Sequence, residues 1–405
     1  MRRSSYKWYI LTLATLSYGI IAGLDRMCLP VLFPEISLDL NLSLVSIGTI
    51  WGMDPLAGMF ISLPSGLIAD RFGLKRTLTI VCILAGLFSA LRAFTHSFFS
   101  LAATMFLFGL MAAITPAIVP KTSALWFPKR YLGLTNALIN TFWYFGSMTA
   151  TMLSATVLSP ALGGWRNTLL VLSAPAVAMG LLWLTTGREP EKSELPPASV
   201  SSVPFKQAFF KVIRNKQVWF IGLIQLAFFG SNTGLYGYLP LYLRNIGWTG
   251  QAADSAITVL NGACMVGIIP MVLLANRLRS NRGVLAFSMV VMSASLLVLP
   301  FVRGNTVFGL LIISGFIRSG GLAIMTVLIF EIKGIGSTYA GTAVGLATSC
   351  AMAGAFISPP VGNSLASFAA GTPFIFWGAL PALALPLLLF IKGGSSHEEG
   401  IKVVG

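Results

Sequence analysis

A few ionisable residues lie inside long apolar stretches of this sequence, notably Asp25, Arg26, Asp54, Lys121 and Arg318. A charged side chain near the centre of a lipid bilayer costs about 2.5–3.5 kcal/mol on insertion scales, so it normally faces a partner, a ligand or a water-filled cavity. Arginine presents a planar fork that suits a carboxylate, whereas lysine acts as a point charge. Arg26, Lys121 and Arg318 together therefore suit the binding of a small anion.

The neighbouring residues Asp25 and Arg26 point about 100° apart on a helix and cannot pair tightly while both face one point. Each needs another partner or a ligand, and two interpretations stay open. In the first, Arg26 and Lys121 line an anion site. In the second, Arg26 neutralises Asp54 or Asp25, and Lys121 extends to the membrane surface near Trp126. Asp54 is also a candidate proton carrier, because burial favours a neutral carboxyl group.

Several polar and aromatic side chains interrupt the apolar stretches of the second half. Tyr236, Asn232 and Asn261 can form hydrogen bonds with ligand hydroxyls, and aromatic faces can pack on a carbon skeleton. Side chains of this kind more often pack between helices than bind a ligand, so each is a weak signal alone. The others are Gln225, Tyr238, Trp51, Trp143 and Tyr144.

These residues need apolar helices to position them. The chain has 405 residues, of which 56% are hydrophobic and only 10% charged, whereas a soluble domain has roughly 25% charged residues. A helix needs roughly 20 mostly apolar residues to cross a bilayer. Twelve such runs predict an all-α membrane protein and argue against a water-soluble enzyme. They lie at 8–34, 45–69, 77–95, 98–125, 132–158, 166–186, 217–243, 253–276, 284–302, 305–331, 339–366 and 372–391.

Most of the 27 Lys and Arg residues lie in alternate segments between these runs. If the N-terminus is cytoplasmic, the outer segments hold only Arg92, Arg166, Arg244 and Arg303. Cytoplasmic loops are enriched in Lys and Arg. We therefore predict a multi-pass protein of the plasma (inner) membrane with both termini in the cytoplasm. Topology then explains the net charge of +15, and no nucleic-acid partner is needed.

A polar segment rich in Pro, Ser and charged residues divides the chain. It predicts an N-terminal six-helix bundle at 1–186, a cytoplasmic linker at 187–216, a C-terminal six-helix bundle at 217–391 and a cytoplasmic tail at 392–405. The halves also share a motif, since GLIADRFGLKRT from Gly66 aligns with VLLANRLRSNRG from Val272. Self-similarity of this kind indicates a duplicated unit.

The twelve runs, the central linker and the G-x-x-x-D-R-x-G-x-K-R loop at 66–76 resemble the major facilitator superfamily of secondary transporters. The resemblance implies two bundles around a midplane cavity that work by alternating access. Asp70 would face a helix N-terminus, that of the run at 339–366, where free N–H groups and the positive dipole end attract a carboxylate. Such a contact predicts a conformational latch, formed by Gly66, Asp70, Arg71, Gly73, Lys75 and Arg76.

A narrower resemblance concerns the anion:cation symporters of that superfamily, which carry sugar acids, phosphate and organic anions. The Asp25-Arg26 pair is similar to their D-R segment in the first span, and Lys121 stands five positions before Trp126-Phe127-Pro128, as a basic residue does in that family. Gly164-Trp165-Arg166 is similar to the family's opening of span six. The resemblance implies that Arg26 and Lys121 contact a substrate carboxylate and that Asp25 takes part in proton coupling. Ala112 replaces an acid common in the family, which leaves Asp54 as a second candidate for the proton.

The expected function is that of a secondary active transporter of a small organic anion, with a carboxylate favoured, coupled to protons as a symporter. We expect a monomer in contact with membrane lipid. The alternative is an efflux transporter for drug-like or amphipathic compounds, although a buried cationic cluster opposes a cationic cargo. Nucleotide-binding and hydrolase motifs are missing from the sequence, and the four Cys lack metal-ligand spacing. We therefore expect no enzymatic activity, cofactor or metal.

Overall fold

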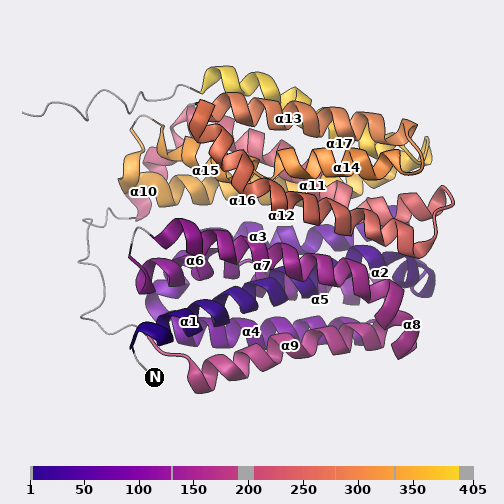
Figure 1. The fold of residues 1–405 in the computed structure, drawn as a ribbon, viewed down its shortest axis with the longest axis horizontal. Helices are drawn as coiled ribbons and strands as arrows, with labels where there is room; N and C mark the ends of the chain where they lie inside the picture. Colours follow the sequence, from indigo (N-terminus) through magenta and orange to yellow (C-terminus); the bar gives the residue numbers. More distant parts are fainter. Residues whose placement is uncertain (1–2, 129–130, 190–204, 279, 333, 392–405) are drawn as a thin grey trace, which may run out of the picture.

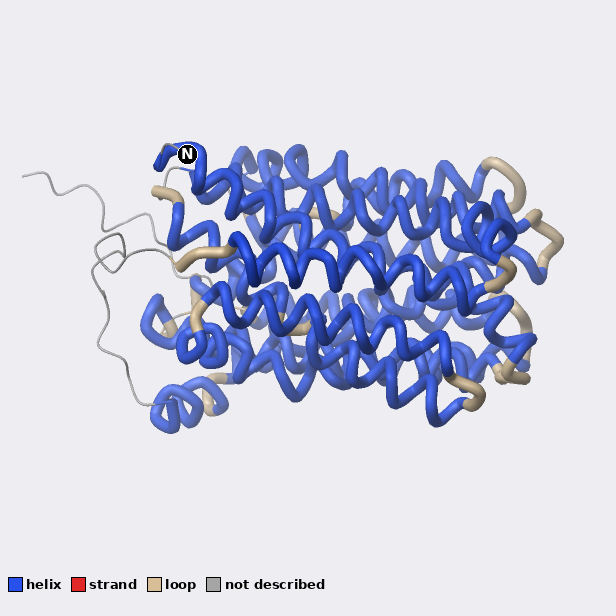
Figure 2. Tube along the Cα trace, turned by 90° about the horizontal axis from the view of Figure 1, so that it is seen from below, coloured by secondary structure: helices blue, strands red, loops and turns tan. Residues whose placement is uncertain are grey.

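The computed structural model describes residues 3–128, 131–189, 205–278, 280–332 and 334–391. Within these ranges all regular secondary structure is helical, as predicted (Figure 2). Ten described segments are long and apolar enough to cross a membrane, and they cover ten of the twelve predicted runs. The other two runs, 132–158 and 305–331, are helical as well, but the second is broken in the middle.

The N-terminal half contains α1 to α9, drawn in indigo to magenta in Figure 1. Its first, third, fourth and fifth crossings are built from more than one helical segment, whereas the second and sixth are continuous. The segments are α1 (Arg3–Tyr18), the π-helix η1 (Gly19–Asp25), α2 (Arg26–Asp39), α3 (Leu44–Phe72), α4 (Leu74–Leu91), η2 (Arg92–Phe94), α5 (Phe98–Ala112), α6 (Thr115–Trp126), α7 (Leu132–Leu153), η4 (Ser154–Leu158), α8 (Ser159–Leu162) and α9 (Trp165–Thr186).

The C-terminal half contains α11 to α17 and lies beside the first half along its whole length (Figure 1). One crossing is broken at Ser319 and Gly320, between α14 and α15. The segments are α11 (Lys216–Asn245), α12 (Gly250–Leu278), α13 (Asn281–Val298), η5 (Leu299–Phe301), α14 (Thr306–Arg318), α15 (Gly321–Phe330), α16 (Gly336–Ser364), η6 (Leu365–Ser367), α17 (Thr372–Ala384) and η7 (Leu385–Phe390).

In its described part, the segment predicted as a polar linker forms the helix α10 (Phe205–Ile213). This helix is amphipathic: Ala208 and Val212 are buried, while Phe210 and Lys211 are exposed. The Lys211 ammonium lies 6.0 Å from the ring centre of Tyr339 on α16. The N-terminus and α10 lie at the same end of the molecule (Figure 1), which we call the linker end; the opposite end is the far end.

The two halves are packed together most closely at the far end, where α3 crosses α16. The crossing depends on glycines: a Cβ at Gly48 would lie 2.8 Å from main-chain atoms of Pro359 and Pro360, and one at Gly52 would lie 2.8 Å from the Phe356 carbonyl. Small residues allow such close approach between helices in a membrane. Asn363 adds a hydrogen bond from Nδ2 to the Leu44 carbonyl, at 2.8 Å.

A second contact between the halves joins α7 and η4 to α12. The hydroxyls of Thr151 and Thr258 are 2.8 Å apart, and the Thr156 hydroxyl donates to Asp254 Oδ2 at 3.2 Å. Asp254 is also held by Arg244, with 2.8 Å between Oδ1 and Nη1. Polar contacts of this kind and the glycine crossing together close the far end.

The close approach at Gly48 generates a test of this closure. We expect Gly48→Ala to open the far end, because the added Cβ meets main-chain atoms that cannot move aside. The readout is maleimide labelling of a cysteine introduced at Thr151, which is fully buried between α7 and α12. Gly133→Ala is the matched control, since a Cβ there meets no atom within 4 Å. Unchanged labelling in Gly48→Ala would contradict the conclusion that the crossing of α3 and α16 closes the far end.

Candidate functional site

Arg26 stands at the start of α2 and forms an ion pair with Asp54 of α3. The distance from Nε to Oδ2 is 2.6 Å, and the two side chains are 24% and 6% exposed. The guanidinium carbon also lies 5.6 Å from the ring centre of Trp51, one turn before Asp54. Of the two interpretations of Arg26, the structure therefore shows the internal pair, and the charge of Arg26 is balanced within the protein in this conformation.

Asp25, the neighbour of Arg26, is fully buried at the end of the π-helix η1. Neither carboxyl oxygen has a hydrogen-bond partner among the described residues. The main chain around it is held by α7: a Cβ at Gly23 would lie 2.7 Å from the Trp143 carbonyl, and the Trp143 indole donates to the Ala22 carbonyl at 3.1 Å. π-Helical turns often mark functional sites, and this one places an unpartnered carboxyl group between two helices.

The sequence analysis counted Arg92 among the charges of the outer segments and did not predict that its side chain is buried. The structure places it at the end of the third crossing with 0% of its surface exposed. Its Nη2 donates to the main-chain carbonyl of Asp25 at 3.0 Å and also contacts the Ser89 hydroxyl, while the guanidinium carbon lies 4.6 Å from the ring centre of Phe108. A long cationic side chain at a helix end can point inward when carbonyls accept its hydrogen bonds and an aromatic face makes a cation–π contact with it.

Arg318 is the cation that the C-terminal half contributes to the interior. It ends α14, is 5% exposed, and donates from Nη2 to the Tyr236 hydroxyl at 3.0 Å. Tyr236 in turn donates to Asn261 Oδ1 at 2.6 Å. Asn261 Nδ2 is buried without a hydrogen-bond partner among the described residues, and the Cys264 thiol is within hydrogen-bonding reach of the Arg318 guanidinium. Three residues predicted separately from the sequence thus form one cluster.

The surroundings of Arg318 contain hydroxyl and thiol groups. Cys264 of α12 and Tyr144 of α7 lie close enough to act on the guanidinium electrostatically. Tyr144 belongs to the N-terminal half, and Tyr236 also lies within electrostatic reach of Arg26. Among the described residues, no carboxylate forms an ion pair with Arg318. The Arg318 cluster (Arg318, Tyr236 and Asn261) therefore lies at the boundary between the halves.

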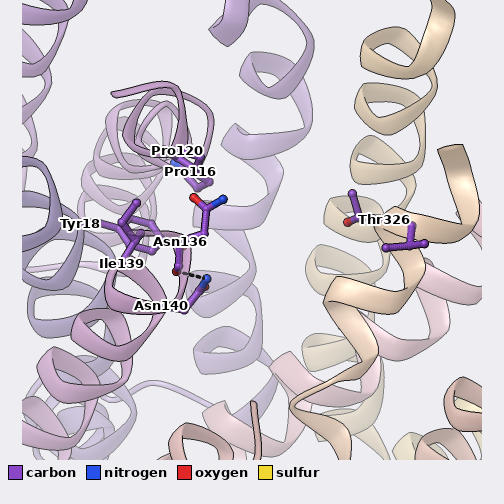
Figure 3. A pocket seen from close by; sticks show the side chains of 8 residues that line it. Tyr18, Pro116, Pro120, Asn136, Ile139, Asn140 and Thr326 are labelled. Carbon is purple, nitrogen blue, oxygen red and sulfur yellow. Dashed lines mark hydrogen bonds between the residues drawn. The ribbon is translucent and has the colours of Figure 1, made fainter. Parts of the chain in front are cut away.

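A cavity of about 350 Å³ lies between the halves towards the linker end (Figure 3). Figure 3 shows Thr326 on one side of it, opposite Tyr18, Asn136 and Asn140. Asn140 Nδ2 donates to the Asn136 carbonyl at 2.8 Å. Tyr18 is the last residue of α1, and the π-helix η1 connects it to Arg26 at the start of α2. The remaining lining residues are Pro116, Pro120, Ile139 and Val327.

The other predicted binding residues are more dispersed. Lys121 is half-buried on α6 and directly follows Pro120, which lines the cavity. Asn232 is half-buried on α11, one turn before Tyr236, and its Oδ1 has no hydrogen-bond partner among the described residues. The sequence analysis missed the cavity residues Tyr18, Asn136, Asn140 and Thr326. The spacing of the two asparagines, four residues apart within an apolar run, is the signal that would have indicated one polar helix face.

The predicted latch lies at the linker end. The side chains of Gly66 and Asp70 lie outside the part of the chain that the structure describes. Arg71 and Arg76 are exposed, and Lys75 is the second residue of α4. Gly73 has a φ of 80°, which favours glycine. The Lys75 main-chain N–H donates to Glu189 Oε1 at 2.7 Å, so a carboxylate that the sequence analysis did not consider caps the first turn of α4.

A family model described as Major Facilitator Superfamily matches residues 15–267, which is more than half of the chain. The chain belongs to this superfamily. The predicted all-α fold class and the predicted resemblance to this superfamily are therefore confirmed. The fold agrees with that of a bacterial homologue of the human lysosomal transporter Spinster in an inward-facing, unoccupied conformation, with a TM-score of 0.76, 15% identity and 95% of both chains covered.

Several curated relatives of this superfamily member are transporters named for sugar acids. It is 25% identical over 203 residues to the probable galactarate/D-glucarate transporter GudP of Bacillus subtilis, covering 47% of this chain and 43% of the relative. It is 26% identical over 261 residues to the hexuronate transporter of the same organism, covering 60% and 58%. The chain spans about half the length of the curated relatives it matches. The predicted resemblance to the organic-anion branch is thereby confirmed.

Proposed function

We propose that this protein carries a small organic anion, a carboxylate, across the membrane by alternating access. The observation that carries the proposal is Arg318, a residue that is 5% exposed and has no carboxylate partner among the described residues. An uncompensated buried charge costs several kcal/mol. An anionic guest offsets that cost when it binds, and the names of the relatives favour the same chemistry.

In this proposal Arg318, Tyr236 and Asn261 receive the carboxylate, and Asn232 lies one turn away on α11. Lys121 and the cavity residues line the approach from the linker end. Arg26 acts through its pair with Asp54, which balances it in this conformation. The two bundles, 1–186 and 217–391, move against each other, and the linker end faces the cytoplasm. The cavity at that end and the closed far end correspond to an inward-facing state.

Proton coupling is the second part of the proposal, and Asp25 is its carrier. An ionised carboxylate that is buried without a hydrogen bond is strongly disfavoured, so the arrangement in this conformation suits the neutral acid. Asp25 adjoins Arg26 in sequence and contacts Arg92 through its main chain. A proton there would be lost when opening of the other side admits water. Asp54 is the alternative carrier, because its pair with Arg26 can break in another conformation.

The anion proposal is tested by uptake into proteoliposomes. A panel of labelled sugar acids and simple carboxylates should enter with the wild-type protein. Arg318→Gln should lower uptake at low substrate concentration by about tenfold or more, since a hydrogen bond to a charged group contributes about 1.5–3 kcal/mol. Arg303→Gln, at an exposed position, is the control and should not change uptake. Uptake of lipophilic cations in place of acids would support the drug-efflux alternative and reject this proposal.

The proton carrier is tested by imposing a pH gradient in the same system. Asp25→Asn should remove the dependence of net uptake on the gradient, while exchange of labelled for unlabelled substrate continues, because a permanently neutral side chain cannot release a proton. If Asp54→Asn has this effect and Asp25→Asn does not, Asp54 is the carrier. A normal gradient response in both variants would exclude the two carboxylates from coupling.

The latch at Gly66, Asp70, Arg71, Gly73, Lys75 and Arg76 is proposed to stabilise the state in which the linker end is closed. Asp70→Asn should lower turnover more than substrate affinity, because the contact forms in one conformation only. Binding by calorimetry and uptake rates separate the two quantities. Glu331→Gln is the control at the same end, since its partner there is the neutral amide of Asn281, at 2.8 Å. Equal losses of affinity and turnover in Asp70→Asn would argue against a latch.

A further inference from the structure

The helix α10 and the first turn of α11 form a surface at the linker end that the proposed transport does not use (Figure 1). Three cations are exposed there, Lys211, Arg214 and Lys216. Two large aromatic side chains accompany them, Phe210 and Trp219, which are 49% and 38% exposed. We call these five residues the α10 surface, and we infer that it binds anionic phospholipid at the membrane–water interface. This binding is separate from the proposed transport, because it concerns the surrounding lipid whichever substrate is carried.

The position of α10 relative to the bilayer follows from its junction with α11. Ile213 is the last residue of α10, and α11 begins at Lys216, where an apolar segment long enough to cross a membrane, Lys216–Asn245, also begins. The Trp219 indole donates to the Ile213 carbonyl at 2.8 Å, so the first turn of this segment is bonded to the end of α10. Tryptophan is enriched at membrane–water interfaces, because its ring is apolar and its N–H is polar. α10 therefore lies at the level of the lipid headgroups.

The exposed aromatic side chains of this surface suit contact with lipid. Leu223 follows Trp219 by one turn of α11 and is exposed as well, as expected where a helix faces acyl chains. Phe210 places another large apolar ring outside the protein core, on α10. In an amphipathic helix at an interface, rings of this kind are buried at the boundary between headgroups and acyl chains. The lipid-facing surface of α11 thus has an apolar counterpart on the helix that precedes it.

The charges of the α10 surface determine which lipid it prefers. Residues 205–223 contain no Asp or Glu, and none of the three cations forms an ion pair with a carboxylate among the described residues. Lys211 lies near the ring of Tyr339, which leaves its charge in place. Membrane topology explains cations at this end, but it does not require exposed aromatic rings beside them. Each Lys or Arg near an anionic bilayer surface strengthens binding about fivefold, so the surface favours anionic over zwitterionic phospholipid.

The test measures which phospholipid contacts α10 in the full-length protein. A fluorescent amino acid is incorporated at Gln207, an exposed position on α10, and the protein is reconstituted into nanodiscs. The quenchers are phosphatidylglycerol and phosphatidylcholine, each brominated at the headgroup end of its acyl chains. At equal content, phosphatidylglycerol should quench about threefold or more strongly than phosphatidylcholine, because it is enriched beside the cations. Equal quenching by the two lipids, or quenching by neither, would overturn the inference.

Variants separate the role of the cations from that of the aromatic rings. The combined change Lys211→Gln, Arg214→Gln and Lys216→Gln should remove the preference for phosphatidylglycerol. Quenching by phosphatidylcholine should continue, since Phe210 and Trp219 still lie in the interface. The matched control is Lys211→Arg, Arg214→Lys and Lys216→Arg, which keeps the three charges and should keep the preference. A preference that persists in the folded glutamine variant would also overturn the inference. The wild-type comparison stands by itself if that variant does not fold, and neither measurement depends on anion transport.

Discussion

A buried guanidinium that no carboxylate of the described residues balances is the main constraint on this molecule. Arg318 lies in an apolar helical body, where an uncompensated charge is costly, yet the described residues give it only a tyrosine hydroxyl, at 3.0 Å, and nearby thiol and phenol groups. The break between α14 and α15 follows it directly. The hydrogen bond from Tyr236 to Asn261 orients the hydroxyl that accepts from Arg318. In the proposed function, a bound anion supplies the negative charge that this cluster lacks.

In the N-terminal half, groups of the protein itself stabilise the buried guanidinium groups. Arg26 is neutralised by Asp54, and Arg92 is surrounded by carbonyls and an aromatic ring. Both arrangements depend on close helix packing around the π-helix, where a Cβ at Gly19 would lie 2.7 Å from the Phe142 carbonyl. In the proposed mechanism one half thus handles the proton through carboxylates, and the other supplies the open cation for the substrate.

The sequence was sufficient to predict the helical class and ten of the spans. It was also sufficient to identify the ionisable residues inside those spans. It could not choose between the two interpretations of Arg26, because the rotation of α2 relative to α3 follows from a π-helical turn that no periodicity reveals. Arg92 was misplaced for a related reason. A charge near the end of an apolar run normally marks a loop, and only the tertiary contacts with Phe108 and the Asp25 carbonyl reverse that expectation.

The proposed anion site and the closed far end share one segment of α11. The Trp51 indole of α3 donates to the Thr233 carbonyl at 2.9 Å, and Gly237 admits the same ring, since a Cβ there would lie 2.6 Å from Trp51 Cδ1. Tyr236, which binds Arg318, lies between these two positions. Trp51 also faces Arg26 at 5.6 Å. A ligand shifts a conformational equilibrium only through different affinities for the two states. In the proposed mechanism, opening of the far end separates Trp51 from residues 233–237. An anion bound beside Tyr236 contacts this same segment, so its binding can favour one of the two states.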